Sequence, residues 1–127
     1  MMKTLVYFRA GNGNYAVPVE STLGVRMASG MVALPAPRPD VVGVLPGEPP
    51  IIVVSPLGAG AEQVLVLQSE GVSYGLLVEQ VTGLGRVDEG EIRPAPTGQE
   101  LALVSGVVGD EGDLVLLADP VAMAKRL

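Results

Sequence analysis

The sequence predicts an all-β protein of two small β-barrel lobes, related by an internal duplication, with few short helices. Three observations lead to this fold class. Val- and Leu-rich runs of about four to six residues alternate with turns, and the 127 residues include 17 Gly and 11 Pro. Charged residues make up only 17% of the chain against 48% hydrophobic residues, whereas a soluble helical protein normally carries more charge on its outer faces. The third observation is that the second half of the chain repeats the first.

The repeat pairs six blocks in the same order across nearly the whole chain. The early blocks share an offset of 59 residues, counted from Leu5 to Val64, and the last two are shifted by four more. The paired blocks are residues 5–8 with 64–67, 15–20 with 74–79, Gly24 with Gly83, 35–37 with 94–96, 41–44 with 104–107, and 51–54 with 114–117. Any all-β chain repeats hydrophobic runs at turn spacing, but this does not explain the matched Tyr, Glu and Pro-Ala-Pro. We therefore interpret the pattern as a structural duplication.

Each half is expected to form, in order, a strand, turn, strand, short connection, extended Pro segment, strand, turn and strand. Gly and Asn supply the positive φ angles of tight turns, which predicts turns at residues 11–14, 69–71 and 109–113. Residues 19–28 and 78–86 suit either short helices or a bending strand.

A half of about 60 residues cannot bury a good core alone. Residues 1–127 are therefore expected to form a single domain. Its lobe segments, about 1–60 and 61–127, would share a boundary or wrap segments across it. Because small barrels close their own sheet edges, two barrels side by side are favoured.

The chain lacks the side chains on which most catalytic and zinc sites depend. It has no His and no Cys, which removes the commonest general base, zinc ligands and thiol nucleophiles. The acidic clusters at residues 88–91 and 110–113 lie in Gly-containing turns, and the second lacks the full spacing of a calcium loop. Gly83 and Gly85 lack the third Gly of a dinucleotide fingerprint. We expect no enzyme activity, no metal and no cofactor.

Charge and hydropathy limit the partners and the location of the protein. The net charge of −6 and the few aromatic residues disfavour nucleic-acid binding through phosphates or stacked bases. No apolar stretch reaches the roughly 18 residues of a transmembrane helix, and the N-terminal apolar run is too short for a signal peptide. The sequence therefore predicts a cytoplasmic protein with no nucleic-acid partner and no direct membrane insertion.

An ordered set of segments resembles the CheW-like family of chemotaxis coupling proteins. The resemblance covers most of the chain, and its specificity lies in the order of the segments and in the duplication rather than in one motif. The matching segments are residues 15–19, 25–26, 34–35 and 41–44 in the first half, and residues 74–81, 91–96, 104–107 and 112–117 in the second.

The resemblance implies two five-stranded, SH3-like barrels around a shared hydrophobic core. It also implies a non-catalytic adapter that joins the cytoplasmic tip of a methyl-accepting receptor to a histidine kinase regulatory domain, or to another CheW-like protein, within receptor arrays. Receptors would dock in the groove between the lobes, and kinase domains would pair with the lobe ends. The receptor-facing positions implied here are Val44, Leu45, Val81, Gly83 and Leu84. The kinase-facing positions are Gly24, Val25, Arg26 and Glu48.

The first half departs from the family pattern where partners would bind. Glu48 takes the place of a usual Arg, Pro56 takes the place of a usual Asp, and Gly24 stands where an acidic residue is common. The loop that follows is cut to residues 58–62. We therefore expect weakened kinase binding. The alternatives are drift at a tolerant loop, an accessory receptor-binding protein that has lost kinase binding, and a small-molecule-binding β-barrel.

Overall fold

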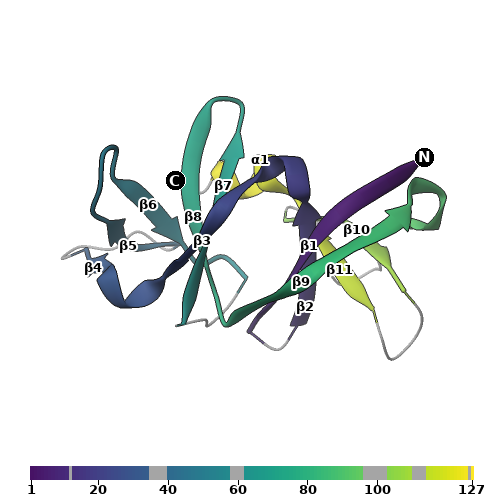
Figure 1. Ribbon diagram of the computed structural model, residues 1–127, viewed down its shortest axis with the longest axis horizontal. Coiled ribbons are helices and arrows are strands. Elements are labelled where there is room, and N and C mark those ends of the chain that lie inside the picture. Colours follow the sequence, from purple (N-terminus) through teal and green to yellow (C-terminus); the bar gives the residue numbers. More distant parts are fainter. Residues whose placement is uncertain (12, 35–39, 58–61, 96–102, 110–113, 126) are drawn as a thin grey trace.

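The computed structural model describes the whole chain except residues 12, 35–39, 58–61, 96–102, 110–113 and 126 (Figure 1). The first half forms β1 (Met2–Ala10), β2 (Gly13–Pro18), η1 (Val19–Ser21), β3 (Thr22–Met27), η2 (Ala28–Gly30), β4 (Val32–Ala33), β5 (Val41–Leu45) and β6 (Ile51–Val54). The second half forms β7 (Gln63–Ser69), β8 (Val72–Val78), β9 (Gln80–Asp88), η3 (Glu89–Glu91), β10 (Val104–Val108), β11 (Val115–Ala118) and α1 (Pro120–Ala124). The predicted all-β class is confirmed.

Two sheets form two lobes, which lie side by side along the long axis of the molecule (Figure 1). The five-stranded lobe has the strand order β10-β11-β2-β1-β9, and the six-stranded lobe has the order β3-β7-β8-β6-β5-β4. The sheets do not divide near residue 60, because each half exchanges strands with the other. Strand β3 leaves its own hairpin to pair with β7, and β9 leaves its own hairpin to pair with β1.

Each sheet curls until its two edges come close together. In the six-stranded lobe the chain leaves edge strand β3 at Met27 and enters β4, on the opposite edge, at Val32. In the five-stranded lobe the chain leaves β9 and η3, and Arg93 then bridges Val107 of the opposite edge strand β10. Connections of this length span at most on the order of 15 Å. Both sheets are therefore small barrels.

The pairing registers show that the lobes are copies of one unit. Strand β5 pairs with β6 around a bulge after Val41, and β10 pairs with β11 around a bulge after Val104. Tyr15 lies opposite Phe8, and Tyr74 lies opposite Leu67. Leu67 is 59 positions after Phe8, as Tyr74 is after Tyr15. These matches confirm the duplication and the equivalence of the two tyrosines.

One predicted block is displaced by a single residue. The ladders pair Val41 with Val54 and Val104 with Ala118, so β6 corresponds to β11 rather than to residues 114–117. The reason is that the connection between β10 and β11 is one residue longer than that between β5 and β6. The predicted Pro-Ala-Pro match and most of the turn at residues 109–113 lie outside the described residues.

The predicted hairpin between β7 and β8 has the expected turn chemistry. Ser69 pairs with Val72, which leaves a two-residue loop. Glu70 and Gly71 have φ angles of 51° and 81°, and positive φ at both central residues is the pattern of a type I′ turn. The undecided segments 19–28 and 78–86 are mainly strand, because each supplies an edge strand to the opposite lobe. Segment 19–28 also contains the 3₁₀ turn η1 and ends at Ala28, the first residue of η2.

The buried side chains form three clusters, one inside each lobe and one shared between the lobes. The lobe clusters contain equivalent residues: Val64, Val53 and Leu45 in the six-stranded lobe correspond to Leu5, Leu117 and Val108 in the five-stranded lobe. The shared cluster is the largest and joins strands of both sheets with the C-terminal helix. Its buried members are Val6, Phe8, Ala10, Val17, Val41, Val54, Leu65, Leu67, Tyr74, Leu76, Val78, Leu103, Ala118 and Met123.

Helix α1 packs against this shared core. Met123 is fully buried in it, and the Tyr74 hydroxyl donates a hydrogen bond of 2.6 Å to the carbonyl oxygen of Pro120. The Asp119 carboxylate caps the helix by accepting hydrogen bonds from the Val121 and Ala122 amides. Burial raises the pKa of Tyr74, and the nearby negative charge of Asp119 raises it further. Tyr74 therefore has a structural role, holding α1 against the shared core.

Candidate interaction surfaces

Strands β3 and β9 are equivalent edge strands, one in each lobe, and they carry most of the predicted partner-facing residues. Each contains a register shift next to a glycine of positive φ, with 154° at Gly24 and 156° at Gly83. Bulges at a sheet edge bend the strand and redirect its side chains. Both strands are largely exposed, so the duplication has produced two equivalent surfaces.

The two edge strands differ in chemistry. On β3, Leu23, Val25 and Met27 are 56%, 46% and 60% exposed, and we call these three residues the β3 strip. The equivalent residues of β9 are Thr82, Leu84 and Arg86, of which Leu84 is 69% exposed. The β3 strip therefore presents three exposed apolar side chains on one edge strand, whereas β9 presents one apolar side chain between a hydroxyl and a positive charge.

A second apolar surface crosses the outside of the six-stranded lobe. Val44 of β5 pairs with Val32 of β4 on one side and with Ile52 of β6 on the other. Directly opposite residues of antiparallel strands share one face of the sheet, and Val32 and Ile52 are 58% and 42% exposed. We call these three residues the valine row. At the equivalent of Val32 the other lobe has Arg93, whose guanidinium donates a hydrogen bond to the Gly109 carbonyl oxygen.

The structure places the predicted receptor-facing residues in both lobes. Val44 lies at the centre of the valine row in the six-stranded lobe, whereas Val81, Gly83 and Leu84 lie on β9 in the other lobe. Gly83 and Leu84 are exposed, and Val81 is half-buried against the shared core. Leu45 is 1% exposed and packs inside its lobe. Its assignment to a binding surface is wrong, because strand alternation turns it inward, away from Val44.

The predicted kinase-facing residues do come together. Gly24, Val25 and Arg26 are consecutive on β3, and Glu48 lies in the exposed connection between β5 and β6. A Cβ atom added at Gly47, next to Glu48, would lie 3.9 Å from Nη1 of Arg26. The connection thus passes close to Arg26 of β3 at the residue next to Glu48.

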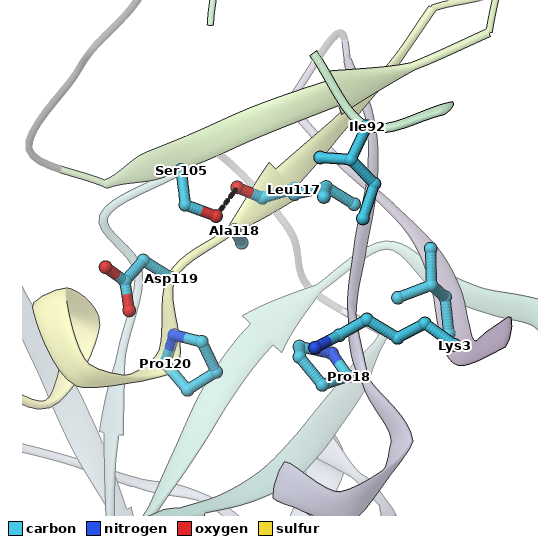
Figure 2. A pocket seen from close by; sticks show the side chains of 9 residues that line it. Lys3, Pro18, Ile92, Ser105, Leu117, Ala118, Asp119 and Pro120 are labelled. Atoms are coloured by element: carbon cyan, nitrogen blue, oxygen red, sulfur yellow. Dashed lines mark hydrogen bonds between the residues drawn. The ribbon is translucent and has the colours of Figure 1, made fainter. Parts of the chain in front are cut away.

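A cavity of about 280 Å³ opens at the end of the five-stranded lobe (Figure 2). Its apolar part includes Leu5, Ile92 and Leu117, and its polar part consists of Lys3, Ser105 and Asp119. Figure 2 shows Lys3 and Asp119 on opposite sides of this cavity. No pattern in the sequence indicates this cavity, because its lining comes from five separate segments that only the barrel brings together.

The described residues contain no group of three or more His, Cys, Asp or Glu side chains that could hold a metal ion. The acidic segment 110–113 lies outside them, so the absence of bound metal stays a prediction. Elemental analysis of protein purified without chelator tests it, and stoichiometric calcium or zinc would contradict it. Among the helices of the described part of the chain, none is long and apolar enough to cross a membrane.

The sequence matches the model of the CheW-like domain over residues 47–127, which is more than half of the chain. The chain belongs to the CheW-like family. A solved structure of the same fold is the scaffolding protein TtCheW from Thermoanaerobacter tengcongensis, with a TM-score of 0.80 and 18% sequence identity, covering 94% of this chain and 90% of that one. No curated protein sequence is significantly similar to the chain. The family model begins at Gly47, so the CheW-like signal in the sequence is concentrated in the later strands.

Proposed function

We propose that this CheW-like protein is a non-catalytic coupling protein of a chemosensory system, which bridges a methyl-accepting receptor tip and a histidine kinase regulatory domain or another CheW-like module. The observation that carries the proposal is the CheW-like match over residues 47–127. Bridging works by equilibrium binding, because an adapter that holds two partners raises the concentration of each near the other. The exposed β3 strip and valine row supply the kind of apolar surface that a protein partner covers.

The receptor surface is proposed to lie on β9, around Leu84 and Gly83. Leu84 is 69% exposed, and a large apolar side chain at a bulged edge can serve as an anchor in a partner's groove. We expect Leu84→Glu to weaken binding of a receptor tip by about 1–3 kcal/mol. Titration calorimetry with a receptor cytoplasmic hairpin measures this change.

The duplication provides a matched control for this experiment. Val25 occupies on β3 the position that Leu84 occupies on β9, because 84 − 59 = 25, and it is 46% exposed. Val25→Glu introduces the same charge on an equivalent strand, but in the proposed kinase-facing surface. It should leave receptor binding unchanged and weaken binding of a kinase regulatory domain. If both variants weakened both partners equally, the assignment of separate surfaces would be wrong.

Weakened kinase binding is proposed to arise from Glu48. A kinase surface that presents a carboxylate to an Arg would meet like charge here, and such reversals act mainly by excluding partners. Glu48→Arg should strengthen binding to the kinase regulatory domain relative to the unmodified protein, with an ordinary coupling protein as reference. The φ of 154° at Gly24 disfavours any side chain there, so Gly24→Glu adds strain and Glu48→Arg alone is the cleaner test.

The accessory role is the second candidate. It is favoured by the same pair of features, namely the missing side chain at Gly24 and the exposed acidic Glu48. Receptor binding without measurable kinase binding, even after Glu48→Arg, would support this role over a weakened bridge. Kinase affinity equal to that of an ordinary coupling protein would contradict both.

A further inference from the structure

The cavity at the end of the five-stranded lobe exists because its side chains are smaller than those of the other lobe. Through the duplication, Pro18, Ser105 and Ala118 correspond to Leu77, Val42 and Val54. Leu77 and Val42 pack together with Met31 around Val53 and Val64 in the six-stranded lobe. The same barrel end is therefore filled by aliphatic side chains in one lobe and hollow in the other.

The strand pairing also matches at the residue that covers each of these places, Ile92 in the five-stranded lobe and Met31 in the six-stranded lobe. Ile92 lies 3.1 Å from where a Cβ atom of Gly106 would be, and Met31 lies 2.8 Å from the corresponding position at Gly43. Gly43 and Gly106 occupy matching places after the two bulges. The strand pairing is therefore the same at both places, and the side chains around them differ.

The lining of the cavity has the composition of a small-ligand site. Leu5 and Leu117 are at most 7% exposed and form an apolar floor. Lys3, Ser105 and Asp119 supply a cation, a hydroxyl and a carboxylate at its rim. Ligand sites typically combine an apolar lining with a few convergent polar groups, and the volume of about 280 Å³ is near their lower limit.

The two charges of the rim select the charge pattern of the ligand. Lys3 lies 3.9 Å from Glu20, whose side chain is 65% exposed and therefore holds it weakly. Asp119 uses Oδ1 to cap α1. A ligand with only an acid would meet the Asp119 carboxylate, and one with only an amine would meet Lys3. A ligand that carries both groups can form a charge-assisted hydrogen bond with each.

We propose that this cavity binds a small aliphatic amino acid, with its carboxylate toward Lys3, its ammonium group toward Asp119, and its side chain on the floor of Leu5, Ile92 and Leu117. Such a site would make the adapter responsive to a metabolite. It goes beyond the proposed coupling function, and binding of the amino acid requires neither receptor nor kinase.

The test is a titration of the full-length protein, followed by the amide resonances in two-dimensional NMR spectra. The probes are leucine, 4-methylpentanoate, which has the acid alone, and 3-methylbutylamine, which has the amine alone. We expect saturable shifts at Leu5, Ile92, Ser105 and Ala118 with leucine, and binding at least about tenfold weaker for either analogue, because each loses one charged partner. The absence of saturable shifts with leucine would overturn the proposal, and equal binding of an analogue would overturn the zwitterion assignment.

Two sets of variants locate the binding. Ser105→Val combined with Pro18→Leu installs the residues that pack together in the other lobe and should abolish the shifts, whereas Ser73→Val, at an exposed position near the start of β8, should leave them unchanged. Should the filled variant fail to fold, Lys3→Gln keeps the core intact. It should weaken leucine about tenfold, because the carboxylate loses its partner, and it should not weaken 3-methylbutylamine, which has no carboxylate for Lys3 to bind. Leucine binding that persists in the folded, filled variant would place the site elsewhere and overturn the proposal.

Discussion

The two lobes have equivalent strand arrangements, but they differ in where their aliphatic side chains lie. The six-stranded lobe fills its interior with Leu77, Val42 and Met31 and leaves aliphatic side chains exposed outside, on the β3 strip and the valine row. The five-stranded lobe has a hollow, partly charged end and carries Arg93 where the other lobe carries Val32. The difference shows that strand pairing fixes the barrels, whereas side-chain identity decides which lobe offers a surface and which offers a cavity.

The matched tyrosines show the same divergence inside the molecule. Tyr74 is fully buried and holds α1 through its hydroxyl. Tyr15 is half-buried and stacks on Phe8, with ring centroids 5.7 Å apart and an angle of 16° between the planes. Burial raises the pKa of both phenols. The tyrosine ring is kept at equivalent positions of the two halves, but only Tyr74 is buried within the shared core, whereas Tyr15 packs against it while partly exposed.

The largest expected effect comes from removing these rings. Tyr74→Ala should lower the free energy of unfolding by about 3–5 kcal/mol, the usual loss for a buried aromatic side chain. Tyr15→Ala should cost clearly less, because its ring is half exposed. Urea unfolding of both variants measures the comparison. Equal losses would mean that the two halves contribute alike to the shared core.

A smaller effect on stability is expected at the position where one lobe has Gly75 and the other has Ala16. A Cβ atom at Gly75 would lie 2.5 Å from Cγ1 of Val64, whereas the equivalent position in the other lobe already holds Ala16. Gly75→Ala should therefore destabilise by about 1–3 kcal/mol through overpacking.

The reverse exchange, Ala16→Gly, should cost about 0.5–1 kcal/mol, because glycine weakens a strand interior. Thermal and urea unfolding of both variants measure the two changes. A stabilised Gly75→Ala protein would contradict the difference in packing between the two lobes.

The Tyr74 hydroxyl itself should contribute about 1 kcal/mol. Tyr74→Phe removes the hydrogen bond to Pro120 and keeps the ring. The raised pKa of Tyr74 also predicts a pH dependence. The folded state holds the proton of this phenol more tightly than the unfolded state does. The stability that this difference contributes is therefore fully present below pH ~10, the pKa of the unfolded phenol, and is lost as the pH rises above it.

This alkaline loss should be smaller in Tyr74→Phe than in the unmodified protein. Unfolding measured from neutral pH to above pH ~10 tests it, with Tyr15→Phe as the matched control. An unchanged alkaline slope in Tyr74→Phe would show that another group causes the loss.

The smallest effect is expected on the outer surface. Val32→Arg gives the valine row the residue of the other lobe and should change the free energy of unfolding by no more than about 0.5 kcal/mol, because Val32 is 58% exposed. A larger loss in urea unfolding would mean that the valine row stabilises its own lobe, which would argue against its being kept apolar for a partner.

Periodicity and repetition were enough to predict the all-β class, the duplication, the turn at residues 69–71 and the equivalence of Tyr15 with Tyr74. These features depend on local turn chemistry and on the order of the blocks, both of which can be read along the chain. The one-residue shift at β11 was missed, because its block lies in a run of similar apolar residues, where hydrophobicity alone cannot fix the register. The inward orientation of Leu45 was missed because the resemblance selected a segment and not a face.

The sequence by itself showed that the chain consists of two similar units and contains no His and no Cys. It also carries the match to the CheW-like domain, which begins at Gly47. Only the tertiary structure decided that β3 and β9 change places, and with them which residues share a surface. The physical reason is that strand exchange joins residues far apart in the chain, so Arg26 meets the connection beside Glu48, and Lys3 faces Asp119 across one cavity. Contacts of such long sequence separation follow from how two barrels close, and no local pattern in the chain records them.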